Sequence, residues 1–331
     1  MKRIKVLALL LATVTVLSVL PGNPVQAKTA SGNIGWGIDV SRHNGAINWS
    51  QVASSGCKFA FIRCGNPQTG MDANFVTNIT NASAAGLRTG VYYYSHATTV
   101  EAAKAEAEQT LAWISNYNVN YPVVYDVEAG GQKKLNAEQM TAIVNTYCSI
   151  IQSAGYYPVV YSYKNFIAQK LPNITWDKWV AQYGQSLNYD NNVTFWQYTS
   201  HGSVAGVPGR VDMDYQYKDY DSLIVKDGWS DQNGGRRYFK NWRMTRGFAD
   251  IEGATRYFDG AGNMAVARFF DDNGKRYYAD ENGVVYKGQI YAINDSLYNF
   301  GPDGVLQTSG EVVTPDMKFI ATESGALVPA Q

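Results

Sequence analysis

Short apolar runs alternate with longer amphipathic stretches from about residue 35 to residue 225. In the longer stretches, 74–85, 101–115 and 136–153, apolar residues recur on one face of a helix. The last of them begins with Asn136 and has Gln139 three residues later, a variant of the helix capping box. Eight short runs are typical of β-strands: WGID (36–39), FAFIR (59–63), TGVYYY (89–94), PVVYD (122–126), YPVVY (157–161), KWVA (178–181), TFWQY (194–198) and VDMDY (211–215).

This alternation predicts an α/β protein with an irregular, TIM-like β/α barrel over residues 35–225. Eight strands are the number that such a barrel needs. The shorter intervals between the later strands leave little room for full helices, so the second half should be irregular. An open doubly wound sheet is the alternative, but no Gly-rich phosphate-binding loop follows the first strand.

The texture of the chain changes after about residue 226, where Gly, Asp, Asn and aromatic residues dominate. Four tyrosines recur 19, 20 and 21 residues apart: Tyr238, Tyr257, Tyr277 and Tyr298. Three turn glycines are each 21 residues apart: Gly262, Gly283 and Gly304. Such a period predicts stacked hairpins over 226–310, each with an aromatic strand, an Asp/Asn-Gly turn and a second strand. We expect a small all-β, solenoid-like repeat domain, followed by a C-terminal tail at 311–331; the alternative is that its aromatics form only core.

The N-terminal segment has the composition of a secretory signal peptide. Basic residues precede an apolar core of 15 residues from Val6 to Leu20, and a cleavage site fits after Ala27. We predict a signal peptide at 1–27, a linker at 28–34 and a mature chain that is secreted, either extracellular or associated with the cell wall. An uncleaved anchor is the alternative, although the core is short for a membrane span. No second long apolar run follows, so we expect no membrane partner after cleavage.

Composition narrows the class of ligand. The chain has a formal net charge of zero and 13% aromatic residues, including 24 Tyr. A neutral chain lacks the basic patch of a nucleic-acid-binding protein, whereas aromatic rings stack on sugars and Tyr OH groups bind hydroxyls. The three His show no metal-ligand spacing, so we expect no metal and no other cofactor. An odd number of Cys, three, argues against a disulfide framework.

The stretch PVVYDVEAGG (122–131) places two carboxylates where a strand ends. Asp126 and Glu128 are two residues apart, so their side chains face the same way and one should have a raised pKa. Asp39 ends the first strand, and Asp212 lies in the last. In a closed barrel the first and last strands are neighbours, and strands 1, 4 and 8 bring their carboxyl ends to one rim. We therefore expect these four carboxylates to line one cleft.

Further residues near the strand ends are candidates for substrate binding: Tyr92, Tyr94, Tyr161, Trp179 and Gln197, with Trp196 beside them. An acidic cleft lined by aromatics matches glycoside hydrolysis. Other interpretations stay open. Asp39 taken alone is typical of a turn or helix cap, Asp214 could be a surface charge, and the aromatics could serve only packing. Three or four carboxylates can also hold Mg²⁺ or Ca²⁺.

Longer motifs carry a family resemblance. GIDVSRHNGAINWSQVASSGCKFAFIRCG, PVVYDVE, WVAQY and WQYTSHGSVAGVPGRVDMD follow one another over about residues 35–220. In this order they resemble the family-25 glycoside hydrolases, secreted or phage-encoded lysozymes that cleave between N-acetylmuramic acid and N-acetylglucosamine in peptidoglycan. The resemblance implies a barrel of mixed β/α and plain β units. It places the catalytic positions at Asp39, Asp126, Glu128 and Asp212, and the family usually has Asn where this chain has Asp214.

The resemblance further implies a retaining hydrolysis with Glu128 as general acid. Asp126 would orient the substrate's own N-acetyl group, as in other enzymes with Asp-x-Glu pairs, or attack as a nucleophile. Asp39 and Asp212 would position the N-acetyl group, adjust the charge of the site and bind the sugar. The expected partners are peptidoglycan glycan strands. A catalytically weak wall-binding or glycan-binding protein is the alternative. A metal-dependent deacetylase or amidase would need His–Asp ligand sets, which the sequence does not contain.

The repeats resemble the cell-wall-binding repeats of choline-binding and glucan-binding proteins, in which a Gly-Trp pair and further aromatics build cages between hairpins. Gly228-Trp229 keeps the pair, but Gly247-Phe248, Arg268-Phe269 and Gly288-Gln289 replace it later. A quaternary ammonium prefers a Trp-rich cage. Choline is therefore disfavoured as the ligand. A wall glycan or a teichoic acid is at least as good a candidate for the cell-wall polymer that the repeats bind.

Overall fold

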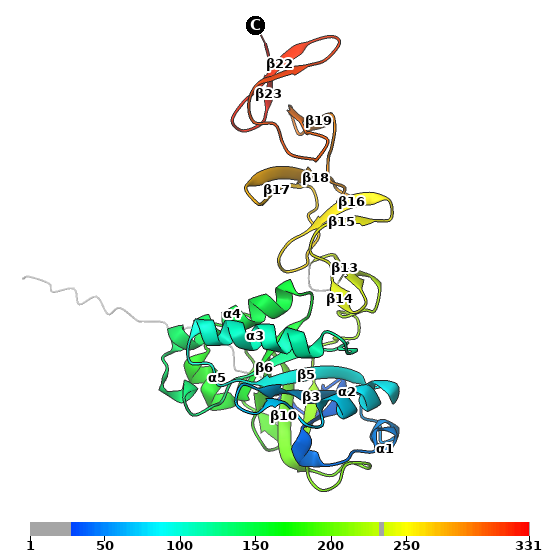
Figure 1. Ribbon diagram of the computed structural model, residues 1–331, viewed down its shortest axis with the longest axis vertical. Coiled ribbons are helices and arrows are strands. Elements are labelled where there is room, and N and C mark those ends of the chain that lie inside the picture. The colour runs from blue at the N-terminus through cyan, green and yellow to red at the C-terminus, as the bar shows by residue number, and fades with distance from the viewer. Residues whose placement is uncertain (1–27, 232–234, 331) are drawn as a thin grey trace, which may run out of the picture.

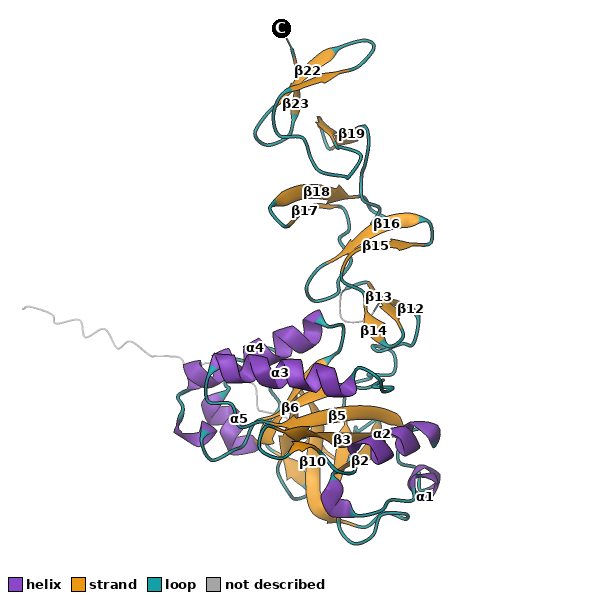
Figure 2. Ribbon diagram, in the orientation of Figure 1, coloured by secondary structure: helices purple, strands orange, loops and turns teal. Residues whose placement is uncertain are grey.

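The computed structural model describes residues 28–231 and 235–330, and the signal peptide predicted at 1–27 lies outside the described residues. Figures 1 and 2 show an α/β domain, from which a line of small β-hairpins extends to the C-terminus. Among the described helices, none combines the length and the hydropathy that a membrane crossing requires.

Eight strands close into a barrel, as the sequence predicts. Their order is β2-β11-β10-β8-β7-β6-β5-β3, and the pairing of β2 with β3 closes the ring. The strands are β2 (Gly35–Val40), β3 (Phe59–Asn66), β5 (Arg88–Tyr94), β6 (Val123–Asp126), β7 (Pro158–Tyr163), β8 (Asp177–Ala181), β10 (Val193–Gly202) and β11 (Val211–Gln216). Three two-residue strands lie outside the ring: β1 (Lys28–Thr29), β4 (Gly70–Met71) and β9 (Ser186–Leu187).

The last barrel strand runs in a direction that the sequence analysis did not expect. β11 pairs antiparallel with both β10 and β2, whereas the other barrel pairs are parallel. The expectation that the eighth strand brings its carboxyl end to the rim is therefore wrong. The connection 203–210 is too short for the crossover that parallel strands need. Asp212 still reaches the rim, because it lies near the start of β11, opposite Asp39.

Helices cover the outside of the first half of the barrel (Figure 2). α2 (Phe75–Ala84), α3 (Val100–Ile114) and α4 (Ala137–Ser153) coincide with the three predicted amphipathic stretches, and α4 has the expected capping box. The shorter helices are α1 (Trp49–Ser54) and α5 (Lys164–Lys170), with single 3-10 turns at η1 (Arg42–Asn44) and η2 (Gln132–Lys134). In the described chain no helix follows β8 or β10, so the barrel is irregular as predicted.

Two apolar layers hold the barrel together. Between strands and helices, residues such as Val91 and Ile143 belong to one buried cluster. Inside the ring, Phe61 stacks on Trp179 with centroids 4.7 Å apart and meets Phe195 edge-on at 5.0 Å. Such aromatic contacts add to the free energy of burial, and they fill the interior with side chains. Ligands are thereby restricted to the ends of the barrel.

The C-terminal region is a row of hairpin units (Figure 1). Its strands are β12 (Gly228–Ser230), β13 (Arg237–Lys240), β14 (Arg243–Met244), β15 (Gly247–Ile251), β16 (Ala254–Phe258), β17 (Arg268–Asp272), β18 (Lys275–Ala279), β19 (Ile290–Ile293), β20 (Ser296–Asn299), β21 (Glu311–Val313), β22 (Lys318–Ala321) and β23 (Leu327–Pro329). The stretch that the sequence analysis assigned to a tail, 311–331, holds the three-stranded sheet of β21, β22 and β23.

The hairpin turns lie before the repeated tyrosines, and not after them as the sequence analysis expected. In β15–β16 the turn is Glu252-Gly253, with φ of 53° and 77°. In β17–β18 it is Asn273-Gly274, with φ of 47° and 75°. Positive φ at both central residues is what a two-residue hairpin turn of the right twist requires. Gly262, at φ 76°, instead turns the chain from one hairpin to the next.

The first hairpin unit closes the amino end of the barrel. Phe239 and Met244 are buried in the same cluster as Phe61 of the barrel interior. The N–H of Met244 donates to the carbonyl of Gly155, in the loop before β7, at 2.8 Å. The guanidinium of Arg246 donates to a carbonyl at the end of α4, with Nε at 3.0 Å. The repeats are thus fixed to the barrel at the end opposite the rim where the parallel strands finish.

Candidate active site

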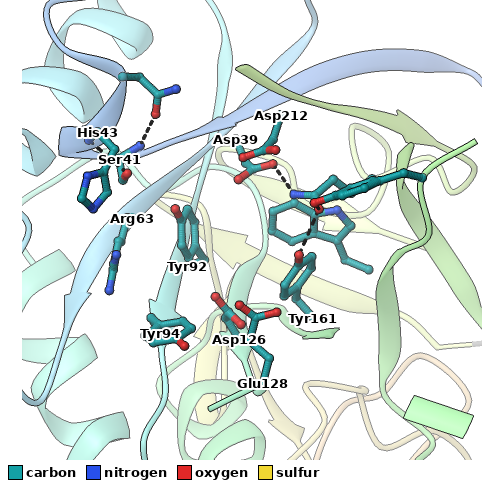
Figure 3. Close-up of a pocket in the computed structure, with 14 residues that line it drawn as sticks. Asp39, Ser41, His43, Arg63, Tyr92, Tyr94, Asp126, Glu128, Tyr161 and Asp212 are labelled. Carbon is teal, nitrogen blue, oxygen red and sulfur yellow. Dashed lines mark hydrogen bonds between the residues drawn. The ribbon is translucent and has the colours of Figure 1, made fainter. Parts of the chain in front are cut away.

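Four carboxyl groups from distant parts of the chain meet in one cleft at the rim (Figure 3). Asp39 of β2 lies opposite Asp212 of the antiparallel β11. Asp126 is the last residue of β6, and Glu128 follows it by two residues. All four line a cavity of about 360 Å³, as the sequence analysis expected. Burial raises the pKa of every one of them.

A chain of hydrogen bonds fixes Asp39 on the floor of the cleft. Gln197 Nε2 donates to Asp39 Oδ2 at 2.8 Å, and the OH of Tyr161 donates to Gln197 Oε1 at 3.0 Å. Tyr183, just beyond β8, donates to the same Gln197 oxygen at 3.3 Å. Because the amide of Gln197 is engaged at both ends, its orientation is set and so is that of the Asp39 carboxyl.

Asp214 is fully buried below Asp39, and is not the surface charge that the sequence left open. Trp179 Nε1 donates to Asp214 Oδ1 at 2.7 Å, and a hydrogen bond joins the carboxyls of Asp214 and Asp39. Asp214 Oδ2 has no N–H or hydroxyl partner in the described part of the chain, so it needs a proton shared with Asp39. Burial, and then the charge of Asp39, raise the pKa of Asp214. The hydrogen bond between the two carboxyls favours the protonated form of Asp214, whose carboxyl then donates the hydrogen bond to Asp39.

The pair predicted from the Asp-x-Glu motif, Asp126 and Glu128, has raised pKa values. Burial, and then the charge of Glu128, raise the pKa of Asp126, and Arg63 opposes the rise. Burial also raises the pKa of Glu128, opposed by Lys133. Glu128 is the more exposed of the two, since Asp126 is only 5% exposed. A carboxyl that keeps its proton to higher pH than usual and can reach a ligand has the properties of a general acid.

The backbone on both sides of Glu128 is held, on one side by strand β7 and on the other by the turn η2. The N–H of Val127 donates to the carbonyl of Tyr161 at 3.0 Å. The N–H of Ala129 donates to Gln132 Oε1 at 3.0 Å, and Gln132 is itself fully buried. The carboxyl of Glu128 makes no hydrogen bond to another described residue. The segment is therefore fixed while its acidic group stays available to a ligand.

The predicted substrate-binding residues all line the same cleft: Tyr92, Tyr94, Tyr161, Trp179 and Gln197. Tyr92 and Tyr94 are half-buried and face the cleft from β5 (Figure 3). Trp179 is only 2% exposed and packs between Phe61, at 4.7 Å, and Tyr161, at 4.5 Å between centroids. Trp179 thus supports the floor and Asp214, and offers no open ring face to a sugar.

The cleft has five further residues that the sequence analysis did not single out: Ser41, His43, Asn44, Arg63 and Tyr183. The first three follow Asp39 in one motif, so their place in the chain was a usable signal. Arg63 was also detectable, as the one charge in the apolar run FAFIR (59–63), because an unpaired charge is rare in a buried strand. Tyr183 follows β8 and is the last residue of the motif WVAQY (179–183), so its place in that motif was a usable signal.

Metal-ligating side chains and cysteine thiols are the other reactive groups of the described chain. Over residues 28–231 and 235–330, no group of three or more His, Cys, Asp or Glu is arranged to hold a metal ion. The three cysteines are buried free thiols. Burial raises the pKa of Cys57 to about 12, so its thiolate is scarce at neutral pH.

Known proteins share the barrel and its cleft-forming segments. Residues 38–207, about half of the chain, match the model of the glycosyl hydrolases family 25. The chain is 30% identical over 182 residues to the autolytic lysozyme of Clostridium acetobutylicum, covering 54% of each protein. It is 31% identical over 199 residues to Lysozyme M1 of Streptomyces globisporus, covering 53% of this chain and 65% of that protein.

A solved structure shows the same similarity. The modular autolysin LytC of Streptococcus pneumoniae, in complex with a synthetic peptidoglycan ligand, is 31% identical with a TM-score of 0.51. The match covers 55% of this chain and 46% of that one, so the chain spans about half the length of this relative and of the autolytic lysozyme. The family match contains three of the four rim carboxyls, Asp39, Asp126 and Glu128, and the fold brings Asp212 to them. The chain belongs to the glycosyl hydrolases family 25.

Proposed function

We propose that the chain is a lysozyme that hydrolyses the β-1,4 bond between N-acetylmuramic acid and N-acetylglucosamine in peptidoglycan. The observation that carries the proposal is the Glu128 carboxyl, which has a raised pKa and lies unpaired in the cleft beside Asp126. Two similar proteins are named as lysozymes, and the similar autolysin was solved with a peptidoglycan ligand, which supports this substrate class.

In the first step, Glu128 protonates the glycosidic oxygen as the bond to the muramic acid C1 breaks. The bonding electrons leave with the oxygen of the departing sugar. The carbonyl oxygen of the substrate's N-acetyl group attacks C1 from the opposite face. Water then opens the resulting ring with Glu128 as the base, so the configuration at C1 is retained.

Asp126 fits the role of orienting the N-acetyl group. Its Oδ1 is buried and has no donor among the described residues, so it can accept the acetamido N–H. Direct attack by Asp126 on C1 is the alternative. The unsatisfied oxygen favours the orienting role, because a bound acetamido group would complete its hydrogen bonding.

The test compares the wild type with Glu128→Gln on purified peptidoglycan. The wild type should release new reducing ends, and the variant should lose about 10²- to 10⁴-fold in rate while keeping its fold. Proton NMR of the fresh product should show the β-anomer first. Equal rates for the two proteins would remove Glu128 from the mechanism, and an initial α-anomer would exclude retention.

We further propose that the hairpin repeats bind a cell-wall polymer and that they do not do so by recognising choline groups. Arg236 and Arg256 lie over the Trp229 ring, with Cζ 4.3 Å and 5.4 Å from its centroid. These guanidinium groups occupy the position that a quaternary ammonium would take. The full-length Glu128→Gln variant should therefore bind purified walls, and free choline should not release it. Release by choline would overturn this assignment, and loss of binding after teichoic acid extraction would identify that polymer.

Secretion is the third element of the proposal, and it is supported by the segment 1–27. A cleaved signal peptide would leave a mature chain that starts at Lys28. N-terminal sequencing of protein from the culture medium should give KTASG (28–32). An N-terminus at Met1 on membrane-bound protein would instead support an uncleaved anchor.

A further inference from the structure

One end of the cleft is cationic, although carboxyl groups gather at the other. Arg63 comes from β3 and lines the cleft together with His43 and Asn44. Figure 3 shows Arg63 on one side of Tyr92 and Asp39 on the other side. The proposed hydrolysis gives roles to the carboxyl groups, but it gives none to the residues at the cationic end.

The guanidinium of Arg63 forms no direct ion pair within the described part of the chain. Among the described residues it makes no ion pair and no hydrogen bond, and its Nε is buried without an acceptor. Its guanidinium lies over the ring of Tyr94, whose centroid is 5.0 Å from Cζ. Arg88, by contrast, pairs with Asp221 at 2.7 Å and donates to the carbonyl of Ile224 at 2.8 Å. A buried Nε–H without an acceptor is costly unless a ligand supplies one.

Arg63 is also close enough to the catalytic pair to act on the same bound sugar. Its charge lowers the pKa of both Asp126 and Glu128, although it contacts neither. A ligand group held by Arg63 would therefore belong to the sugar at the pair or to a substituent of it. The planar fork of a guanidinium matches a carboxylate with two parallel hydrogen bonds.

We propose that Arg63, beside His43 and Asn44, forms a subsite for a carboxylate carried by the muramic acid residue next to the cleaved bond. This inference rests on the proposed function. Muramic acid differs from glucosamine by a lactyl ether on O3, which ends in a carboxyl group. That group is either free or joined to a peptide that carries carboxylates of its own. Chitin has the same sugar backbone without any carboxylate, so Arg63 would make the enzyme selective for muramic acid.

The experiment measures kcat and KM for the wild type and Arg63→Gln on three soluble substrates. These are peptide-free glycan strands with a free lactyl carboxylate, the same strands after conversion of the carboxyls to amides, and strands that keep their peptides. Arg42→Gln is the control, because Arg42 neighbours the subsite and carries the same charge but does not line the cleft. Arg63→Lys keeps the charge and loses the fork.

A charge-assisted hydrogen bond of ordinary strength predicts that Arg63→Gln raises KM about 10- to 100-fold on a carboxylate-bearing strand, with kcat changed less than about threefold. For the wild type, KM should rise by a similar factor when the strands are amidated. For Arg63→Gln, amidation should not raise KM further. Arg63→Lys should lie between them, and Arg42→Gln should match the wild type. An effect confined to peptide-free strands would identify the lactyl carboxylate, and one confined to peptide-bearing strands would identify a peptide carboxylate.

Several results would overturn the subsite. One is an equal rise in KM on charged and amidated strands, which would show that Arg63 acts only through the charge of the catalytic pair. Another is a variant that folds by circular dichroism and keeps wild-type KM on every strand. If Arg63→Gln does not fold, the comparison of charged with amidated strands in the wild type and Arg63→Lys decides. No cleavage of any strand by the wild type would instead reject the proposed function.

Discussion

Replacing Asp214 by Asn should stabilise the protein, and the gain should grow with pH. Asp214 is fully buried, donates a hydrogen bond to Asp39 when protonated and accepts one from the indole N–H of Trp179. An Asn amide can do both, since its NH₂ donates and its oxygen accepts. The substitution therefore keeps the hydrogen bonds and removes only the requirement for a proton.

The size of this gain in stability follows from the proton that Asp214 must keep when the wild type folds. In the unfolded chain an Asp ionises with a pKa of about 3.9, whereas burial raises the pKa of Asp214 well above that value in the folded protein. A raised folded pKa gives stability that is complete below the unfolded pKa and is lost as the pH rises toward the folded pKa. Each pH unit in this window costs the wild type about 1.4 kcal/mol. Asp214→Asn carries no such cost.

The assay is urea unfolding followed by Trp fluorescence, for both proteins, from about pH 5 to about pH 8. The free energy of unfolding of Asp214→Asn minus that of the wild type should rise by up to about 1.4 kcal/mol per pH unit, until folded Asp214 loses its proton. Asp214→Leu is the control, and it should be less stable at every pH by about 1–3 kcal/mol, because it leaves Trp179 Nε1 unpaired. A difference that does not change with pH would show that Asp214 holds no extra proton.

Three further changes test other parts of the account. Lys133→Gln removes a charge that lowers the pKa of Glu128, so Glu128 should keep its proton to higher pH. The alkaline limb of the pH profile of kcat/KM should therefore shift to higher pH, and an unshifted limb would contradict this. Gln197→Leu should cut kcat/KM at least about tenfold, because Asp39 loses its buried partner at 2.8 Å, and wild-type kinetics would argue against a role for this network. Met244→Ala should lower the free energy of unfolding by about 2–5 kcal/mol with kcat unchanged, because it opens a cavity at the amino end of the barrel; a fall in kcat without loss of stability would be the opposite result.

Local sequence patterns were sufficient to predict the strands, the main helices and the gathering of the rim carboxyls. Each buried strand is a dense apolar run, and each long helix has one apolar face. Asp39, Asp126, Glu128 and Asp212 all end or begin such runs, so the position of each followed from the position of its strand. Closure of the ring was enough to bring them together.

Features that depend on contacts across the fold could not be predicted in the same way. The apolar pattern of a strand is the same in either direction, so it did not reveal that β11 is antiparallel. Asp214 is buried against Trp179 of β8, 35 residues away in the chain, and local spacing does not reveal that contact. In the repeats, each unit contains two turns with Gly or Asn, and spacing alone did not tell which of them joins the paired strands.

The central claim is that the cleft cleaves one particular bond of peptidoglycan. The most direct measurement is the identity of the new reducing end, found by borohydride reduction and mass spectrometry of the soluble products from purified peptidoglycan. The account predicts reduced muramic acid at every new end with the wild type, and none above background with Glu128→Gln. Reduced glucosamine at the new ends, or no cleavage of any peptidoglycan by the wild type, would contradict it.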